Sequence, residues 1–289
     1  MFARGKPSEP KTKVSSLPIL GRRSTPRVEV ILRGGLGNQL FGYSAGTELA
    51  TRLGTSLHLI IDSNMGAEGA KRQFCLDGFL SSGVTWSDTG TKMKRFEEKS
   101  FGFDQRFSEL SEPHLLVGYF QSWKYFVESA AMIKAQLSLS PQFANGRRIA
   151  GHEFLGLHLR RGDYLLPKNA KFHGVVPFEF FKTGLHHLRK VSGNLPGIIF
   201  SDDIHEAKEL SRQLNDCEIF DEDLTLGPLG VLGALSSANG HVISNSTFGW
   251  WGAFLSSNDG TVIAPRPWLK GGHFNTTDLL PPRWLSLGF

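Results

Sequence analysis

An arginine pair follows an apolar run in the middle of the chain. Residues 158–164 read HLRRGDY and come directly after a predicted strand at 154–159. Because strand side chains alternate between faces, His158 and Arg160 point to the same face and Arg161 begins the loop. Two adjacent guanidinium groups are costly to bury without an anion, and their fixed donors match a phosphate. The pattern favours a nucleotide diphosphate site; a solvated charge cluster balanced by Asp163 is the alternative.

A second motif combines small hydroxyl residues with a tryptophan pair. Residues 244–253 read SNSTFGWWGA. Ser246 and Thr247 fall in the first turn of a predicted helix, where free backbone N–H groups form an anion site. We expect the tryptophans to pack in the core between domains, with stacking on a sugar as the alternative. Asn245 opens a formal glycosylation sequon, whose position at the end of an apolar strand argues against its use.

Acidic residues follow two further predicted strands. Asp202 and Asp203 end one strand and open a helix. A carboxylate there can cap the helix, bind a metal, or accept hydrogen bonds from a nucleobase or ribose. We expect Asp203 to be the cap. Asp221 and Asp223 have the spacing of a metal–diphosphate site, but this spacing is common by chance.

A glycine-rich loop follows the first predicted strand. Residues 33–41 read RGGLGNQLF. As a dinucleotide fingerprint the loop is weak, because glycine would be required at position 40, where the chain has leucine. Gly35 and Gly37 allow a ligand or another element to approach the backbone closely, and Asn38 can cap the following helix. The loop either faces a ligand, together with Gln39, or is a purely structural turn.

All four motifs lie where a predicted strand ends, which is where open α/β sheets bind their ligands. Short β-branched runs alternate with amphipathic stretches, as in parallel sheets covered by helices. The predicted strands are 28–32, 57–61, 114–117, 154–159, 197–200, 217–220, 241–244 and 261–264. The predicted helices are 39–53, 122–137, 178–191, 203–214, 228–238 and 246–256.

This order predicts an α/β fold with two Rossmann-like βα domains. We expect a basic disordered tail at 1–27, a first domain at 28–140 and a second at 141–289, joined near 138–152. Residues 63–113 are irregular and are either an insertion or a poorly defined part of the first domain.

The composition is that of an ordinary globular protein. The chain has 289 residues, 40% of them hydrophobic, and a net charge of +5. Seven of the 32 basic residues and one of the 27 acidic residues fall in 1–27, so the remainder is close to neutral. The basic charge therefore does not indicate a nucleic-acid partner, and allows weak contact of the tail with anionic lipid. The tail lacks the apolar core of a signal peptide, and no stretch is long and apolar enough for a membrane helix. Two cysteines, Cys75 and Cys217, are expected to be reduced.

The four motifs in this order resemble those of the α-1,2-fucosyltransferases of glycosyltransferase family 11. The resemblance rests on GLGNQ at 35–39, HLRRGDY at 158–164, SDD at 201–203 and NSTFGWWGA at 245–253, and spans 28–265. It implies a two-domain GT-B-like fold, GDP-fucose as donor, an inverting reaction, and no cofactor or essential metal.

The resemblance also implies roles for individual residues. Arg160 would bind the β-phosphate, and Arg161 would support it or the loop. His158 and Asp202 would contact guanine, and Asp163 would lie near the acceptor hydroxyl. The donor site would further include Asn245, Ser246 and Thr247, with the loop residues Gly35, Gly37, Asn38 and Gln39. One departure is Gly249, which stands where the family more often has serine.

The predicted function is transfer of L-fucose to the 2-hydroxyl of a β-galactoside in a surface glycan. The alternatives are another GDP-linked deoxysugar as donor, a metal-dependent transferase using Asp221 and Asp223, or an inactive GDP-sugar-binding or polyanion-binding protein. Since the membrane anchor of eukaryotic members is not seen, we expect a cytoplasmic enzyme with at most peripheral membrane contact through residues 1–27.

Overall fold

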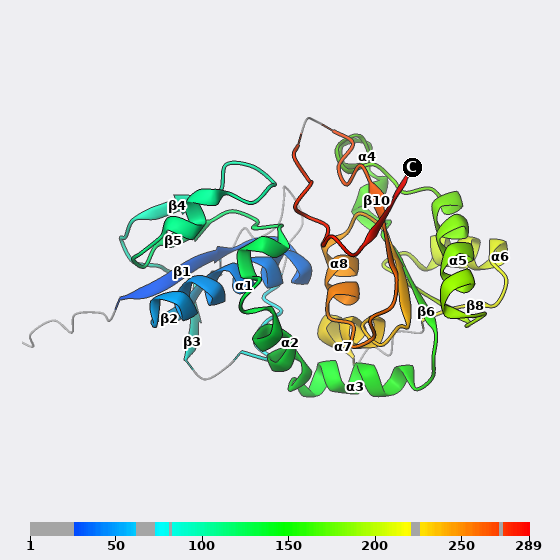
Figure 1. The fold of residues 1–289 in the computed structure, drawn as a ribbon, viewed down its shortest axis with the longest axis horizontal. Helices are drawn as coiled ribbons and strands as arrows, with labels where there is room; N and C mark the ends of the chain where they lie inside the picture. Colours follow the sequence, from blue (N-terminus) through cyan, green and yellow to red (C-terminus); the bar gives the residue numbers. More distant parts are fainter. Residues whose placement is uncertain (1–25, 62–72, 81–82, 221–225, 272–273) are drawn as a thin grey trace, which may run out of the picture.

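The computed structural model describes residues 26–61, 73–80, 83–220, 226–271 and 274–289. The described chain forms two separate sheets flanked by helices (Figure 1). The first sheet has the strand order β3-β2-β1-β5-β4 and the second has the order β11-β10-β9-β6-β7-β8. All the strand pairs in both sheets are parallel. The predicted α/β class with two parallel sheets is confirmed.

The first sheet forms around the apolar strand β1, which pairs with β2 on one side and β5 on the other. Helix α1 follows β1 and ends at Gly54, whose φ of 61° suits the left-handed C-cap. The elements of this half are β1 (Arg27–Leu32), α1 (Leu36–Leu53), β2 (Ser56–Ile61), β3 (Val84–Ser87), β4 (Arg95–Glu97), η1 (Gln105–Glu109), β5 (Leu115–Val117), η2 (Trp123–Phe126) and α2 (Ala130–Ser138).

The irregular stretch 63–113 belongs to the first sheet. It supplies β3 and β4, which are the two edge strands. Both are short and largely solvent-facing, so they lack the apolar alternation by which strands are recognised in a sequence. Residues 62–72 and 81–82 of this stretch lie outside the described residues.

The second sheet is centred on β6, all five residues of which are buried between β9 and β7. A strand covered on both faces reads as a continuous apolar run, and the strand predicted at 154–159 is confirmed. The elements of this half are α3 (Pro141–Ala150), β6 (Leu155–Leu159), η3 (Gly162–Leu165), α4 (Pro167–His173), α5 (Phe178–Ser192), β7 (Gly197–Ser201), α6 (Ile204–Gln213), β8 (Cys217–Ile219), α7 (Gly227–Leu235), β9 (Gly240–Ile243), α8 (Thr247–Phe254), β10 (Val262–Arg266) and β11 (Leu285–Gly288).

The connection between the sheets differs from the prediction. The helix expected at 122–137 is divided into η2 and α2, and the expected linker contains α3. Helix α3 packs tightly on α7. The two backbones are so close that a Cβ at Gly146 would lie 1.8 Å from the Gly230 carbonyl oxygen. Helix α4 and strand β11 were not predicted from the sequence.

An aromatic cluster joins the two halves where α1 meets α8 (Figure 1). Trp250 and Trp251 are fully buried, and their ring centroids lie 4.7 and 5.2 Å from that of Phe41. The Trp250 indole N–H donates to the Leu279 carbonyl oxygen at 2.9 Å. The expectation that the tryptophan pair packs in the core is confirmed, and the alternative of sugar stacking is excluded by burial.

Among the helices in the described ranges, none combines the length and hydropathy required to cross a membrane. Cys75 and Cys217 are reduced thiols, as expected.

Candidate functional site

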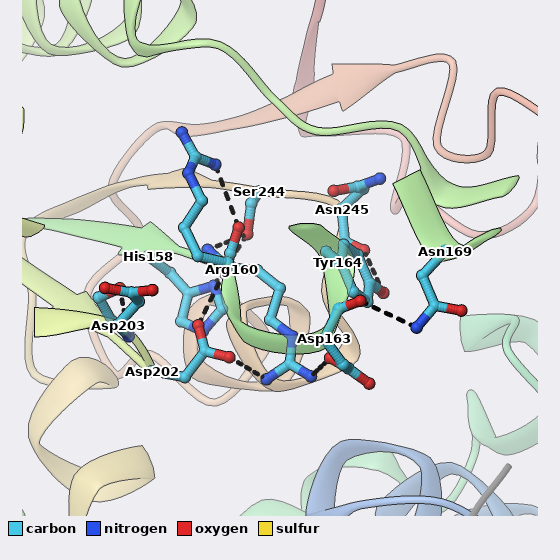
Figure 2. A network of polar contacts seen from close by, with 11 residues as sticks. His158, Arg160, Asp163, Tyr164, Asn169, Asp202, Asp203, Ser244 and Asn245 are labelled. Carbon is cyan, nitrogen blue, oxygen red and sulfur yellow. Dashed lines mark hydrogen bonds and ion pairs between the residues drawn. The ribbon is translucent and has the colours of Figure 1, made fainter. Parts of the chain in front are cut away.

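Arg160 lies at the carboxyl end of β6, between two carboxylates (Figure 2). Its guanidinium donates to Asp202 Oδ2 at 2.6 Å and to Asp163 Oδ1 on its other side. The side chain is 21% exposed and its guanidinium also lies over the Tyr164 ring. Because this guanidinium is partly exposed and already pairs with carboxylates, an incoming anion can replace one of the two carboxylates.

Asp202 holds the loop that carries the arginine pair. One carboxylate oxygen accepts from the Arg161 backbone N–H at 2.8 Å, while the other accepts from Arg160. Because Asp202 directly follows β7, the strand next to β6, this contact ties the ends of the two strands together. Asp203 caps α6 by accepting from the N–H groups of His205 and Glu206, as predicted.

Arg161 points away from Arg160 and is almost fully buried. Its Nε donates to Glu206 at 2.8 Å and its guanidinium lies over the Phe178 ring. These contacts neutralise the charge of Arg161 within the protein, so the charge is not directed toward a ligand. Of the two roles implied for Arg161, the geometry supports that of holding the loop.

His158 lies beneath the loop as a neutral imidazole. Burial, with the nearby charge of Arg160, lowers the pKa of His158 to about 3. Its Nδ1 lies 3.1 Å from Ser244 Oγ, which also accepts from the Arg160 backbone N–H. The ring stacks on Phe248 in the first turn of α8. His158 and Arg160 therefore share the hydroxyl of Ser244.

The N-terminus of α8 meets the N-terminus of α1. A Cβ at Gly37 would lie 2.5 Å from the Thr247 carbonyl carbon and 2.7 Å from the Phe248 nitrogen, so only glycine permits this approach. Ser246 is the N-cap residue of α8 and its side chain makes no capping hydrogen bond. Gly35 is the N-cap residue of α1, and a Cβ there would meet open space. Two helix N-termini, both of which favour negative charge, thus lie together at the carboxyl ends of the sheets.

Two predicted ligand contacts are instead internal anchors. The Gln39 side chain is fully buried and bonds to the backbone of Gly34, Gln73 and Cys75. The Asn245 amide is also buried and donates to carbonyl oxygens of His173, Gly174 and Trp268. These placements do not support direct ligand contact by either side chain, because their donors already bond to the protein.

Asn38 is half-buried and accepts from Gln121 at 2.9 Å. It therefore links α1 to the segment after β5 and does not act as the helix cap, a position that Gly35 occupies. The structure thus brings Arg160, Asp163, Asp202 and His158 into one network, next to the α8 terminus with Ser246 and Thr247.

Three residues of the network were missed from the sequence. Ser244 joins His158 to Arg160, Glu206 neutralises Arg161, and the Tyr164 hydroxyl donates to the Asn245 carbonyl oxygen at 3.2 Å. Tyr164 and Ser244 both belong to motifs already recognised by their strand ends. Glu206 follows Asp203 at the spacing of a helix turn, but no local signal relates it to Arg161.

The described ranges contain no group of three or more His, Cys, Asp or Glu side chains suited to a metal ion. Asp221 and Asp223, the residues of the metal-dependent alternative, lie outside the described residues.

Comparison with known proteins decides the family. The model of the family described as Glycosyl transferase family 11 matches residues 85–287. The chain belongs to glycosyl transferase family 11. The resemblance drawn from the four motifs is confirmed, and the protein is a glycosyltransferase.

Curated relatives of this family 11 protein share about a quarter of its residues. An Escherichia coli alpha-1,2-colitosyltransferase is 25% identical over 89% of this chain and 97% of its own length. The E. coli O-antigen biosynthesis glycosyltransferase WbnK is 27% identical, over 89% of this chain and 99% of its own. The mouse galactoside 2-alpha-L-fucosyltransferase Sec1 is 24% identical, over 86% of this chain and 70% of its own.

Solved structures show the fold that the family 11 chain adopts. Fucosyltransferase NodZ from Bradyrhizobium matches with a TM-score of 0.52 at 13% identity, covering 80% of this chain and 94% of NodZ. NodZ alpha-1,6-fucosyltransferase soaked with GDP-fucose matches with a TM-score of 0.53, also at 13% identity, covering 86% of this chain and 97% of that one. The predicted GT-B-like architecture is thereby confirmed.

Proposed function

We propose that this family 11 protein transfers L-fucose from GDP-fucose to the 2-hydroxyl of a β-galactoside, with inversion at the sugar carbon. The observation that carries the proposal is the position of Arg160, a partly exposed guanidinium at the carboxyl end of β6. Relatives named as galactoside fucosyltransferases and a neighbour soaked with GDP-fucose support the choice of donor and acceptor.

The chemical requirement is a leaving group with stabilised negative charge. Cleavage of the bond between fucose and the β-phosphate leaves GDP, whose terminal phosphate gains charge in the transition state. In our proposal Arg160 pairs with that phosphate, and the α8 N-terminus with Ser246 and Thr247 covers it. Positive charge and N–H groups from the chain itself make a metal ion unnecessary for this step.

The remaining polar groups have roles consistent with their partners. Asp202 is 31% exposed on its side chain, so it can contact the nucleoside once a phosphate has replaced it on Arg160. His158 is neutral and buried, which does not favour the guanine contact implied for it by the resemblance. In our proposal it keeps the donor side of the loop in place through Ser244. We assign Asp163, 37% exposed, to the acceptor hydroxyl, from which it would take a proton as that oxygen attacks the sugar.

The test is transfer from GDP-fucose to lactose or a type 1 galactoside in excess EDTA, with the linkage of the product determined by NMR. An α1,2-fucosylated product supports the donor, linkage, stereochemistry and metal independence together. Loss of turnover in EDTA, restored by added Mg²⁺ or Mn²⁺, would contradict the metal-free reaction. Tight GDP binding without turnover would favour an inactive GDP-sugar-binding protein.

A second candidate is transfer of another GDP-linked deoxysugar. Its support is the colitosyltransferase, which is as similar to this chain as the named fucosyltransferase. Competing the two GDP-sugars at equal concentration gives the ratio of their kcat/KM values. A ratio above one for the other sugar would replace fucose as the proposed donor.

A further inference from the structure

Beyond the charged network, a continuous row of ring contacts leads away from Arg160. Tyr164, under the Arg160 guanidinium, stacks on His173 with a centroid distance of 4.3 Å and an angle of 10°. His173 contacts Phe172 at 4.9 Å, and Phe172 contacts Phe274 at 5.5 Å. Phe274 contacts Phe101 at 4.9 Å, and Phe101 stacks on Tyr119 at 6.5 Å. We call these six residues the aromatic row: Tyr164, His173, Phe172, Phe274, Phe101 and Tyr119.

The outer part of the aromatic row is open to solvent. Phe172 is 36% exposed, Tyr119 is 38% exposed and Phe274 is 40% exposed. Trp86 on the edge strand β3 is the one other described Phe, Tyr or Trp that reaches this exposure. Exposed rings are therefore concentrated at one place in the described chain, and such concentration marks a binding surface.

The aromatic row crosses from one half of the molecule to the other. Tyr164 and Phe172 come from η3 and α4 beside the second sheet, and Tyr119 follows β5 of the first. Phe274 joins them from the segment after β10, which passes between the two halves (Figure 1). A Cβ at Gly102 would lie 3.5 Å from the side-chain nitrogen of Asn275, so this segment lies against the loop of Phe101. The row thus lies where both halves meet beside the charged network.

The row begins on the acceptor side of Arg160. Asp163 and Asp202 contact the guanidinium from opposite sides (Figure 2). Asp163 lies in η3 together with Tyr164, the first ring of the row, whereas Asp202 directly follows β7. A group that approaches Asp163 along the rings would reach the position that we assign to the attacking hydroxyl.

We propose that the aromatic row is the acceptor subsite, and that it takes an oligosaccharide whose terminal galactose lies near Asp163. This inference rests on the proposed function, because it assumes that Asp163 marks the acceptor side. Sugar rings carry C–H faces that stack on aromatic rings, while their hydroxyls keep contact with water. The exposed rings come from three chain segments, so sugars beyond the terminal galactose also stack on them. The aromatic row therefore binds longer acceptors more tightly than short ones.

The test is steady-state kinetics of Phe172→Ala and Phe274→Ala with acceptors of one, two and four sugar units at saturating GDP-fucose. We expect the acceptor KM to rise about tenfold for each variant with the longest acceptor, as for loss of one aromatic stacking contact. The increase should be smaller for the monosaccharide, which is too short to reach Phe274. Phe274→Tyr keeps an aromatic ring and should have the wild-type acceptor KM. Trp86→Ala removes an exposed ring elsewhere and is the matched control.

Donor readouts separate this inference from the proposed function. The Kd for GDP and the rate of GDP-fucose hydrolysis without acceptor should be unchanged in both alanine variants. Saturation-transfer NMR of lactose with GDP-bound protein reports acceptor binding without turnover. If the wild type transfers no fucose but its lactose signal is lost in the Phe172→Ala, Phe274→Ala double variant, the proposed function fails and the acceptor subsite stands.

Three results would overturn the inference. The first is an unchanged acceptor KM in folded variants of both phenylalanines. The second is an equal loss for all acceptor lengths accompanied by weaker GDP binding, which would indicate damage to the donor site. The third is a change in oligomeric state with unaltered acceptor kinetics, which would identify the rings as a protein interface.

Discussion

Gly249 lies directly beneath His158, so that a Cβ at position 249 would come 2.6 Å from the His158 Nδ1 atom. The family more often has serine at this position, and the His158 ring here lies where that side chain would be. Glycine at position 249 therefore leaves the space that the His158 ring occupies. The ring in turn shares the Ser244 hydroxyl with the Arg160 backbone N–H.

Replacing Gly249 by alanine should push His158 out of place. Because the ring is enclosed, we expect a loss of about 1–3 kcal/mol in the free energy of unfolding, the usual cost of overpacking. We also expect weaker GDP binding, since the loop of Arg160 would shift. Urea unfolding and calorimetric titration with GDP measure the two effects. Gly288→Ala is the control, because a Cβ there meets only the Arg266 oxygen at 3.9 Å; an equal loss in both variants would contradict the argument.

Replacing Arg160 by alanine should lower kcat by at least two orders of magnitude, as for removal of a charge-stabilising donor. The change also removes the cation that Asp163 and Asp202 share, and both carboxylates then face the donor phosphate without it. Arg160→Lys keeps the charge but loses the two-sided fork, so an intermediate rate is expected. Single-turnover kinetics with GDP-fucose measures the step, and near-normal rates in Arg160→Ala would refute phosphate binding by this residue.

Replacing Asp163 by asparagine tests its role at the acceptor hydroxyl. General-base assistance contributes about 10²–10⁴-fold, so transfer should slow by up to that factor while the Kd for GDP stays close to the wild-type value. The matched control is Asp203→Asn, because asparagine also caps helices well and Asp203 does not contact Arg160. An unchanged rate in Asp163→Asn would rule out the base role.

Buried neutral histidines should make stability depend on pH. Burial lowers the pKa of His158 to about 3 and that of His241 to about 4, whereas both titrate near 6.5 when unfolded. The unfolded state therefore binds more protons below pH 6.5, and the free energy of unfolding should fall as the pH drops from 6.5 to 5. Each histidine contributes up to about 1.4 kcal/mol per pH unit.

Urea unfolding at several pH values measures this slope. His241→Asn should make it shallower by one histidine's share. Burial raises the pKa of Glu98, which acts in the opposite direction, so Glu98→Gln should make the slope steeper. A free energy of unfolding that is constant from pH 7 to 5 in all three proteins would contradict neutral burial of the histidines.

Local sequence patterns predicted the parts of the site that depend on neighbouring residues. The apolar run at 154–159 correctly put His158 at the end of a buried strand, and the position of Asp203 before a helix correctly predicted a cap. The expectation that the tryptophan pair packs in the core was also correct. These features follow from the alternation of strand side chains and the free N–H groups of a helix start, which act within a few residues.

The tertiary structure decided which distant groups meet. That β7 lies beside β6, and so presents Asp202 to Arg160, is a result of strand order. The approach of Gly37 to the α8 N-terminus is a result of how the two halves pack together. The same packing turns Gln39 and Asn245 inward as anchors and brings Phe274 between Phe172 and Phe101. Motifs and strand patterns alone were enough to predict the family, the two parallel sheets and the strand ends that carry the site. The partner of each charge and the course of the aromatic row depended on the packing of the sheets, because residues far apart in the chain have no local pattern that fixes their contact.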